Sequence, residues 1–471
     1  MAVQKPDGTQ DMLPNEALFW DHFKSTAWDI FSRYGYQPIE TPLFEQTDLF
    51  VRGIGESTDV VSKEMFQTIS GNNMAKLASY AIDHHDELAQ LPTSEDRAQQ
   101  MVSGALKNKS RLSMRPEGTA GTVRAIAQHG LITQGGAPVK LMYAGPMFRA
   151  ERPQKGRQRQ FNQVGVECLG AEDASIDAEG IIMLMRFYRE IGIPVQSTRL
   201  LLNSIGCASC RPAYRKALKD YLLAHADFLC DDCVRRADIN PLRAFDCKNP
   251  ECQKVMEHAP RITDYLCDDC RAHYHAVTSY LDAQGITYSE DPTLVRGLDY
   301  YTRTVFEIQV DNGMGSQNAI GGGGRYDGLM KEIGGTACPG FGFALGYERC
   351  ALALSAVGIE PKESPKSDLY VACVDAVEKP LAFNLVQALR DAGISADMDH
   401  QDRSLKSQFK QAGKMGVRLT VVIGPDEVAA GVVKLRDMSD HSERDLALDA
   451  TMNYLGDHAD AHDLSVEDLL A

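Results

Sequence analysis

The chain has 471 residues, of which 44% are hydrophobic and 24% are charged, and its formal net charge at pH 7 is −16. A chain of this length forms more than one hydrophobic core, so about two to four domains are expected. The acidic balance excludes nucleic-acid binding through the whole surface, but it allows a local basic site. No apolar run approaches the length of a membrane span, and the first residues lack the apolar stretch of a signal peptide. We therefore expect a cytoplasmic protein without a membrane partner.

The first predicted element is an amphipathic helix over residues 14–34, because apolar side chains recur there at helical spacing. The stretch "YQPIETPLFE" that follows is expected to be a strand, and its prolines indicate a sheet edge or an interface. Residues 71–111 are polar and mixed. We expect them to form a helical surface insertion without a catalytic role.

Two apolar strands are expected between Lys140 and Leu169, separated by a polar loop, which predicts a long antiparallel hairpin with a charged tip. The tip, residues 149–159, carries five basic side chains against one acidic side chain. A strand is expected at residues 197–206, followed by a cysteine-rich, mainly helical segment that reaches to about residue 290. Strands return in "RTVFEIQV" and "GSQNAIGGGGRYD", and a strand-to-helix run follows in "PGFGFALGYERCALALSAV".

Beyond a proline- and lysine-rich linker at residues 358–367, strand and helix periods alternate. This pattern predicts a small α/β domain over residues 368–471. Basic side chains three or four residues apart are expected to share one helix face; they are Arg403, Lys406, Lys410 and Lys414. A solvated helix face is the plainest interpretation of them.

Five stretches that contain arginine need a common explanation. They are "SMRPEGTAG", "PMFRAERPQKGRQRQFNQVGVE", "LVRGLDYYTRTVFE", "GGGGRYDG" and "GFGFALGYERC". Arginine is permanently charged and binds anions with two parallel hydrogen bonds, so arginines that converge from separate strands predict a site for a triphosphate or another polyanion. No P-loop sequence accompanies them. Taken singly, each arginine is more typical of a surface ion pair.

Eight of the twelve cysteines lie in four close pairs. The pairs are Cys207/Cys210, Cys230/Cys233, Cys247/Cys252 and Cys267/Cys270. In a reducing compartment this spacing fits one or two structural zinc ions held by thiolates, and the partnership among the pairs stays open. Eight buried free thiols are the alternative. The remaining cysteines are expected in the core; they are Cys168, Cys338, Cys350 and Cys373.

Taken together, the motifs resemble the class II aminoacyl-tRNA synthetases, and among these the histidyl-tRNA synthetase family, over essentially the whole chain. "PDGTQDMLP" is similar to the family's N-terminal stretch, "IETPLFE" with the helix before it resembles motif 1, and "FRAERPQKGRQRQFNQVGVE" resembles motif 2. "LVRGLDYYTRTVFE" and "GGGRYDGL" resemble the two histidine-specific peptides, and "GFALGYER" resembles motif 3.

The resemblance implies an α+β catalytic domain, in which an antiparallel sheet is flanked by helices. It further implies a Cys-rich, mainly helical insertion domain and a C-terminal α/β anticodon-binding domain. The implied boundaries are 1–204 and 291–357 for the catalytic domain, 205–290 for the insertion domain, and 368–471 for the anticodon-binding domain. A homodimer is implied as well, with motif 1 at its interface.

The implied activity is that of a histidine–tRNA ligase, which makes histidyl-adenylate and pyrophosphate from L-histidine and ATP and then transfers histidine to the 3′ end of tRNA(His). By resemblance, Arg149 binds the α-phosphate and the carboxylate, Arg349 binds the γ-phosphate, and Arg157 assists from the loop. Arg296 approaches the reacting phosphate as a fixed cation, so Arg149 and Arg296 are the expected catalytic residues. Magnesium is expected to accompany ATP.

Histidine itself is expected to be recognised through both ring nitrogens, by Glu167 on one side and Tyr301 on the other. The full histidine-binding set that the resemblance implies is Glu117, Gly118, Thr119, Arg149, Gln163, Glu167, Arg296, Tyr300 and Tyr301. Within it, Glu117, Thr119 and Gln163 would bind the α-amino group. For the two tyrosines, packing within a strand is the alternative.

Contacts with tRNA are implied in two places. Arg152 and Gln154 in the basic loop are candidates to read the terminal base pair, and Arg403, Lys406 and Lys410 are candidates to meet phosphates near the anticodon. Two positions depart from the family pattern, since Ala150 replaces a commoner histidine and "GYER" replaces a form with leucine. The segment 71–111 has no counterpart in the compact family pattern, and its role stays open.

Two other classes of function compete with the ligase. One is a synthetase-like paralogue that senses histidine or uncharged tRNA without making adenylate, and the other is a zinc-ribbon nucleic-acid binder with an unrelated core. The chain keeps Arg149, Arg296, Arg349 and a full C-terminal domain, which favours the enzyme over the sensor. The zinc-ribbon hypothesis leaves the arginine and tyrosine stretches unexplained.

Overall fold

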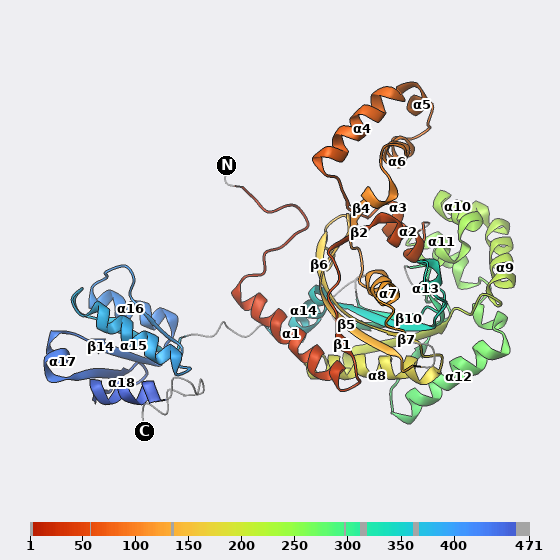
Figure 1. Ribbon diagram of the computed structural model, residues 1–471. Coiled ribbons are helices and arrows are strands. Elements are labelled where there is room, and N and C mark those ends of the chain that lie inside the picture. Colours follow the sequence, from red (N-terminus) through yellow and green to blue (C-terminus); the bar gives the residue numbers. More distant parts are fainter. Residues whose placement is uncertain are drawn as a thin grey trace. The chain divides into compact units, whose positions relative to one another are not determined.

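A computed structural model describes residues 3–56, 58–132, 136–295, 298–310, 318–360 and 367–457. The chain divides into two compact units, Met1–Lys362 and Glu363–Ala471, and Figure 1 labels their elements. Within the described residues, no helix combines the length and the apolar character that crossing a membrane requires.

An eight-stranded sheet forms the centre of the first unit, in the order β1-β5-β6-β11-β10-β9-β7-β8. Its strands are β1 (Gln37–Pro38), β5 (Val139–Phe148), β6 (Gln160–Leu169), β7 (Thr198–Ser204), β8 (Ser289–Glu290), β9 (Thr302–Val310), β10 (Ala319–Arg325) and β11 (Gly340–Gly346). The long strands pair antiparallel, whereas the short edge strands β1 and β8 run parallel to their neighbours. The predicted hairpin is confirmed, because β5 pairs with β6 from Val139↔Leu169 to Phe148↔Gln160.

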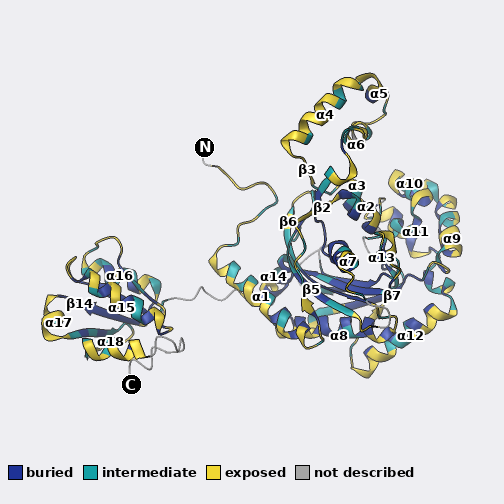
Figure 2. Cartoon of the chain, viewed as in Figure 1, coloured by how far each residue is buried: buried dark blue, intermediate teal, exposed yellow. Residues whose placement is uncertain are grey.

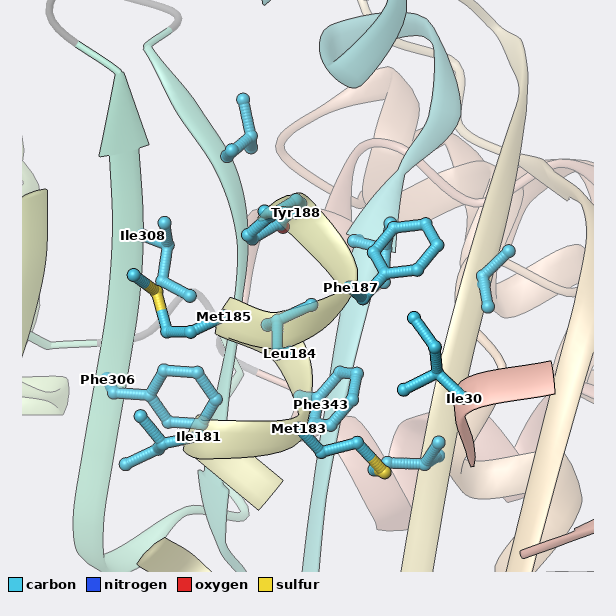
Figure 3. Packing of buried hydrophobic residues seen from close by; sticks show 14 of the residues in the cluster. Ile30, Ile181, Met183, Leu184, Met185, Phe187, Tyr188, Phe306, Ile308 and Phe343 are labelled. Carbon is cyan, nitrogen blue, oxygen red and sulfur yellow. The ribbon is translucent and has the colours of Figure 1, made fainter. Parts of the chain in front are cut away.

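Helices cover both faces of this sheet. On one face lie α8 (Ala174–Glu190) and the predicted N-terminal helix, which is observed as α1 (Pro14–Ser32). Figure 3 shows side chains of α8 packed against Phe306 of β9, Phe343 of β11 and Ile30 of α1. The other face is covered by α7 (Thr119–Gln128), whose apolar side chains share a separate core with Leu141. Met142 belongs to the α8 core, as the alternation of side chains along a strand requires.

The segment "YQPIETPLFE" forms two short strands instead of the single strand that the sequence predicts. The first is β1, and the second is β2 (Phe44–Gln46), which belongs to a three-stranded sheet with β3 (Gln67–Thr68) and β4 (Leu112–Met114). Between them the carbonyl of Thr41 accepts a hydrogen bond from Arg115 Nη1 at 3.0 Å, and Pro42 has no N–H to donate to a ladder. Both strands lie at sheet edges, so that part of the prediction is confirmed.

Residues 71–111 form a helical arm, as predicted. Its helices are α4 (Gly71–Asp83), α5 (His85–Ala89) and α6 (Ser94–Ala105), followed by the 3₁₀ turn η1 (Asn108–Ser110). Helix α4 packs closely on α6, because a Cβ at Gly104 would stand 2.2 Å from the ring of Tyr80. Figure 2 shows that most of the arm is exposed.

The short helices α2 (Thr47–Ile54), α3 (Asp59–Ser62) and α13 (Leu329–Glu332) lie near α7, and α14 (Tyr347–Ala356) follows β11 directly. The turn η2 (Val195–Ser197) leads into β7. The cysteine-rich segment is mainly helical, as predicted. It comprises α9 (Arg211–Ala224), η3 (Ala226–Phe228), α10 (Asp231–Ile239), η4 (Pro241–Asp246), α11 (Pro250–Glu257), η5 (Ile262–Tyr265) and α12 (Asp268–Ala283). This segment has a hydrophobic core of its own, while the second half of α12 joins the α8 core.

The second unit is the α/β fold that its alternating periods predict. A five-stranded sheet has the order β13-β12-β14-β15-β16, with β12 parallel to both of its neighbours. Its strands are β12 (Leu369–Cys373), β13 (Ala396–Met398), β14 (Leu419–Ile423), β15 (Val432–Asp437) and β16 (Glu443–Ala447). Its helices are α15 (Lys379–Asp391), α16 (Leu405–Met415), α17 (Pro425–Ala430) and α18 (Leu448–Asp457). The antiparallel pair β15–β16 was not anticipated from the sequence.

Candidate active site

Three arginines from distant parts of the chain line one cavity of about 170 Å³. Arg149 directly follows β5, Arg157 lies in the hairpin loop, and Arg349 lies in the first turn of α14. Arg349 is held by two carbonyl oxygens, because its Nε donates to Gly156 at 3.1 Å and its Nη1 donates to Ala319 at 3.0 Å. The hairpin and α14 therefore bring their cations to a common wall, where a carbonyl of β10 helps to hold Arg349.

Three guanidinium groups line this cavity together with the carboxyl groups of Glu151, Glu307 and Glu348. Burial lowers the pKa of Arg349, and the positive charges of Arg157 and Arg149 lower it further. Arg149 Nε donates to the carbonyl of Pro116 at 3.0 Å, and its guanidinium lies 5.2 Å from the ring centroid of Phe161. The carboxylate of Glu151 pairs with Arg157 Nη1 at 2.7 Å and lies 4.0 Å from Arg149 Nη1. Cations held this close together favour a polyanionic ligand.

Polar side chains complete the wall of the arginine-lined cavity. Gln163 of β6, Glu307 of β9 and Glu348 of α14 all line it. The Glu348 carboxylate is fixed by Asn162, whose backbone N–H donates to both carboxylate oxygens at 2.9 and 3.1 Å. Burial raises the pKa of Glu348. Carboxylate oxygens are the ligands that Mg²⁺ prefers, so the residues present fit a magnesium ion that enters with a polyphosphate.

A second polar centre lies around Glu167 of β6, which is fully buried. The hydroxyl groups of three residues donate to its carboxyl group: Thr119 at 2.6 Å, Tyr143 at 3.3 Å, and Tyr326. Burial raises the pKa of Glu167 to about 8. At neutral pH this carboxyl group is therefore largely protonated, and it can both donate and accept a hydrogen bond.

The turn before α7 carries three of the predicted residues to this centre. The carboxylate of Glu117 accepts from the backbone N–H of Thr119 at 2.7 Å and of Ala120 at 2.9 Å, so it caps the first turn of α7. Burial raises the pKa of Glu117. A Cβ at Gly118 would stand 2.2 Å from the ring of Tyr143, so this position requires glycine.

Tyr300 and Tyr301, the adjacent tyrosines of the "LVRGLDYYTRTVFE" peptide, are buried beside the same centre. Their rings lie with centroids 4.6 Å apart, and Tyr300 also meets Tyr326 edge-on at 5.6 Å. Burial raises the pKa of Tyr300, and the neighbouring Tyr301, Glu117 and Glu167 raise it further. Arg296, the predicted catalytic cation of this peptide, lies outside the described residues.

Strand β6 joins the two centres. Gln163 and Glu167 lie four residues apart in an unbroken ladder, so they share one face at a separation of about 13 Å. Gly165 lies between them, where a Cβ would stand 2.4 Å from the Tyr143 hydroxyl oxygen. One strand face therefore carries an arginine-lined end and a hydroxyl-lined end.

Comparison with known proteins places this arrangement in a family. The family model for histidyl-tRNA synthetase matches residues 8–79 and 81–350, and the model for the anticodon binding domain matches residues 368–458. The first match includes most of the 71–111 arm. The chain belongs to the histidyl-tRNA synthetase family. Its fold is accordingly the class II synthetase fold, with a C-terminal anticodon-binding domain.

Individual relatives agree with the family match. The histidine–tRNA ligase of Moorella thermoacetica is 44% identical over 454 residues, which cover 96% of this chain and 98% of the relative. That of Halothermothrix orenii is 44% identical over 438 residues, covering 93% and 95% of the two chains. The crystal structure of apo S. aureus histidyl-tRNA synthetase matches with a TM-score of 0.74 at 34% identity, and covers 96% of this chain and 100% of that one.

Two of the five arginine stretches supply the arginines of the cavity, and Arg296 of the "LVRGLDYYTRTVFE" stretch lies outside the described residues. The remaining two, "SMRPEGTAG" and "GGGGRYDG", use their arginines elsewhere. Arg325 is fully buried and binds Asp177, with its Nη2 2.6 Å from Oδ1, and Asp177 also lies 2.7 Å from His273 Nε2. Arg115 donates to the carbonyls of Pro146 and Thr41. The expectation that all five stretches supply cations to a polyanion is therefore wrong for these two, because each satisfies buried polar groups within the fold.

The eight paired cysteines of the family member form two clusters of four. The first comprises Cys207, Cys210, Cys267 and Cys270, and the second comprises Cys230, Cys233, Cys247 and Cys252. Within each cluster all the sulfur atoms lie within 4.8 Å of one another. The Sγ atoms of Cys207 and Cys267 are 3.9 Å apart, and so are those of Cys230 and Cys247. Thiolates bound to zinc at about 2.3 Å in a tetrahedron lie about 3.8 Å apart, so both clusters fit the ion.

The thiols of the two clusters differ in their protonation: the pKa values of Cys207 and Cys230 are lowered, whereas burial raises those of Cys233, Cys252 and Cys270. The pKa of Cys207 is lowered to about 6 by hydrogen bonds that overcome the effect of burial. The backbone N–H groups of Cys230 and Cys267 donate to the Sγ atoms of Cys252 and Cys210, each at 3.2 Å. The other four cysteines are buried, as predicted for core positions.

The residues predicted to meet tRNA lie at two exposed places. Arg152 and Gln154 are exposed at the tip of the hairpin, where Gln154 and Arg157 exchange backbone hydrogen bonds at 3.1 and 2.9 Å. In the second unit Lys406 and Lys410 are exposed on α16, together with Lys414. Arg403 precedes that helix, so the prediction of one shared helix face is wrong for it. Its side chain instead donates to Gln401 Oε1.

Several residues at the two centres were not identified from the sequence, including Glu307 and Glu348, which line the arginine-lined cavity. Tyr143 lies in an apolar strand and was interpreted as a core residue. The alternation along β5 places it on the sheet face that carries Glu167, to which its hydroxyl donates. Tyr326 was quoted only as part of "GGGRYDGL". Asn162 carried no signal, because its role depends on Glu348, which lies 186 residues away.

Proposed function

We propose that this chain activates L-histidine with ATP, forming histidyl-adenylate and pyrophosphate, and then transfers histidine to the 3′ end of tRNA(His). One observation carries the proposal: a cavity lined by three arginines lies along the same strand face as a buried carboxyl group ringed by hydroxyls. The first is suited to a triphosphate and the second to an imidazole. Membership of the histidyl-tRNA synthetase family supports the assignment.

In the first step, a histidine carboxylate oxygen attacks the α-phosphorus of ATP and pyrophosphate leaves. The carboxylate and the triphosphate repel each other, so their charges must be neutralised and the reacting atoms held in line. Arg149 binds the α-phosphate and the carboxylate, Arg349 binds the γ-phosphate, and Arg157 assists. The attacking carboxylate is already ionised at neutral pH, so this step needs no general base. When bound, magnesium neutralises the phosphates, and Glu307 and Glu348 are the carboxylates placed to hold it.

Arg296 supplies a further fixed cation at the reacting phosphate. The support is its position in the sequence, four residues before Tyr300 and five before Tyr301 in the "LVRGLDYYTRTVFE" peptide. The two tyrosines are buried beside Glu167. In this assignment Arg149 and Arg296 are the catalytic residues.

Histidine is selected through hydrogen bonds to both nitrogens of its ring. Glu167 and Tyr301 contact the two nitrogens, and Tyr300 lines the pocket. Glu117, Gly118, Thr119 and Gln163 surround the α-amino group. A site of this kind rejects leucine or phenylalanine strongly, because binding either one leaves the polar groups of the pocket unpaired.

Each cysteine cluster holds one structural zinc ion, giving two ions per chain. The support is the fit between the sulfur separations and a tetrahedral thiolate site. Free thiols in this number persist in a reducing compartment, which favours the cytoplasm.

The tRNA meets the chain through the hairpin tip and the second unit. Arg152 and Gln154 read the terminal base pair of the acceptor stem, while Lys406 and Lys410, with Arg403 beside them, contact anticodon-loop phosphates. The chain forms a homodimer through its motif 1 segment. Large apolar side chains are exposed there, with Leu43 at 43% and Phe44 at 53% exposure. Sedimentation that gives a monomer would contradict the dimer.

The test of the function is ATP–pyrophosphate exchange with each of the twenty amino acids in turn, followed by aminoacylation of a tRNA(His) transcript. We expect exchange with histidine alone and charging of that transcript. Silence with every amino acid would contradict the proposal and would favour the synthetase-like sensor.

A further inference from the structure

The tyrosines of the histidine pocket are attached to the cysteine-rich segment by charged hydrogen bonds. Asp299, which directly precedes them, accepts from Arg243 Nη2 at 2.5 Å and from Asn240 Nδ2 at 3.2 Å. Its backbone N–H donates to the carbonyl of Ile54 at 3.0 Å. The Arg243 side chain is 12% exposed and that of Asp299 is 28% exposed, so water screens this ion pair only partly.

A second link joins the cysteine-rich segment to the same peptide two residues further along the chain, at Tyr301. The guanidinium of Arg211 donates to the carbonyl oxygen of Tyr301. Arg211 directly follows Cys210 and is the first residue of α9. Its Nε also donates to the carbonyl of Ile205 at 3.4 Å, which ties it to the end of β7.

The positions of these anchors in the chain connect them to the two cysteine clusters. Arg211 adjoins a ligand of the first cluster. Asn240 and Arg243 lie between Cys233 and Cys247, both of which belong to the second cluster. The chain between these two cysteines is short and consists mainly of α10 and η4. Binding of both cysteines to one ion therefore restricts the positions of Asn240 and Arg243.

Polar contacts dominate the link between the cysteine-rich segment and the pocket. The apolar core of the segment is separate from the core that contains Tyr300 and Tyr301. A cavity of about 410 Å³ is lined from both sides, by Arg211, Leu242 and Arg243 of the segment and by Leu298 and Asp299. Asp299 also lies close to Gly55, where a Cβ would stand 2.8 Å from Asp299 Oδ2, so this position requires glycine.

We propose that the cysteine-rich segment, once its clusters hold zinc, positions residues 298–301 and thereby sets the affinity of the chain for histidine. The inference rests on the proposed function, since it requires histidine binding at Tyr301 and metal binding by the clusters. Arg211, Asn240 and Arg243 are positioning residues, because they act through Asp299 and the Tyr301 backbone. Loss of metal then weakens histidine binding, although no cysteine of the clusters belongs to the pocket.

The experiment compares Arg243→Ala and Arg243→Lys with Lys254→Ala in the full-length chain. Lys254 is a matched control, since it lies on α11 of the same segment and pairs with Glu251 at the surface. The KM values for histidine and for ATP are measured in the exchange assay, the Kd for histidine by titration calorimetry, and zinc by elemental analysis. For Arg243→Ala we expect histidine KM and Kd to rise about tenfold, with ATP KM and zinc content unchanged.

The lysine variant keeps the charge without the forked geometry, so it should restore part of the affinity, and Lys254→Ala should match the unaltered protein. A double variant, Cys230→Ser with Cys233→Ser, should lose one zinc ion and show the same histidine-specific loss. If that double variant does not fold, the Arg243 variants still test whether the cysteine-rich segment positions residues 298–301.

The possible outcomes distinguish failure of this inference from failure of the proposed function. Histidine affinity that Arg243→Ala leaves unchanged, in an enzyme that charges tRNA(His), would overturn the positioning role alone. Unaltered protein that binds histidine but contains no zinc would overturn the part played by the metal. Unaltered protein that binds no histidine at all would overturn the proposed function and this inference with it.

Discussion

The two ends of one face of β6 solve opposite electrostatic problems. Near Gln163, three arginines gather around a small cavity, where burial and then the charges of Arg157 and Arg149 lower the pKa of Arg349. Near Glu167, a buried carboxyl group is surrounded by hydroxyls, and burial raises its pKa to about 8. The difference teaches that charge and selectivity are kept apart. In the proposed function, permanent charge serves the end that would bind phosphates, whereas neutral hydrogen-bonding groups serve the end that would distinguish histidine from other amino acids.

A second contrast separates arginines that serve the ligand from those that serve the fold. Arg325 and Arg349 are both largely buried, but Arg325 has a matching carboxylate in Asp177. Arg349 binds carbonyl oxygens and faces two other arginines. Arg325 is therefore held by a carboxylate inside the fold, whereas Arg349 lies in the wall of a cavity that a ligand can enter.

The largest effect is expected at the cationic end. Arg149→Ala should lower the rate of histidine-dependent ATP–pyrophosphate exchange by about a thousandfold, because the developing charge on the α-phosphate loses a fixed donor. Histidine binding should weaken by about tenfold, far less than the rate falls, because Arg149 also binds the histidine carboxylate in the proposed site. Arg199→Ala is the matched control, since Arg199 lies on β7 and binds Gln309 at the surface. Exchange that survives in Arg149→Ala at the rate of this control would contradict the role given to the cavity.

Substitution of Arg325, which pairs with Asp177 inside the fold, should instead lower the stability of the protein. Arg325→Ala leaves the carboxylate of Asp177 buried with its ion pair broken, so the free energy of unfolding of the first unit should fall by about 3–5 kcal/mol. Arg349→Ala should change it far less, because its removal relieves repulsion. Urea unfolding followed by circular dichroism measures both. Equal destabilisation by the two variants would break the distinction between them.

At the neutral end, Glu167→Gln tests the raised pKa. The carboxyl group is expected to titrate at about 8 in the folded chain and near its usual value in the unfolded chain. Between these values the folded state holds one more proton, so the stability that this proton contributes is complete at low pH and is lost as the pH rises toward 8. Glutamine cannot ionise and removes this dependence.

The stability of Glu167→Gln relative to the unaltered chain should therefore improve as the pH rises from 5 to 8, by up to about 1.4 kcal/mol per pH unit. Chemical denaturation at several pH values in that range, without histidine, provides the measurement. Parallel curves for the two proteins would show that Glu167 is ionised throughout, and so would rule out a neutral pocket.

The smallest effect is expected from one hydroxyl of the pocket. Tyr326→Phe removes a donor to Glu167 while keeping the ring that packs on Tyr300, so histidine affinity should fall by about five- to tenfold, corresponding to about 1 kcal/mol. The KM for ATP should not change. Tyr370→Phe, a buried tyrosine of the second unit, is the control. An equal rise in both KM values would show that Tyr326 supports the sheet and has no specific part in the pocket.

Elements specified by local periodicity were predictable from the sequence. The β5–β6 hairpin, α1 and the alternating elements of the second unit follow from apolar spacing alone. The segment at 37–46 was predicted as one strand and forms two, because its break depends on a hydrogen bond from Arg115, which lies 74 residues beyond Thr41.

Site residues were predictable from the sequence where a motif contains them, and not where a distant partner residue determines their position. Arg149, Arg157 and Arg349 were expected around one ligand, and they line one cavity. Arg325 carried the same signal, but its partner Asp177 lies 148 residues away and could not be read from the sequence. The cysteine partnership was open for the same reason, since Cys207 clusters with Cys267, which lies 60 residues further along.

The most direct test of a site divided between phosphate and imidazole is a crystal structure with ATP, magnesium and histidinol. Histidinol keeps the ring and the amino group of histidine but has no carboxylate, so it cannot react. The account predicts the triphosphate among Arg149, Arg157 and Arg349, and the imidazole between Glu167 and Tyr301. A triphosphate bound away from those arginines, or an imidazole turned away from Glu167, would contradict it.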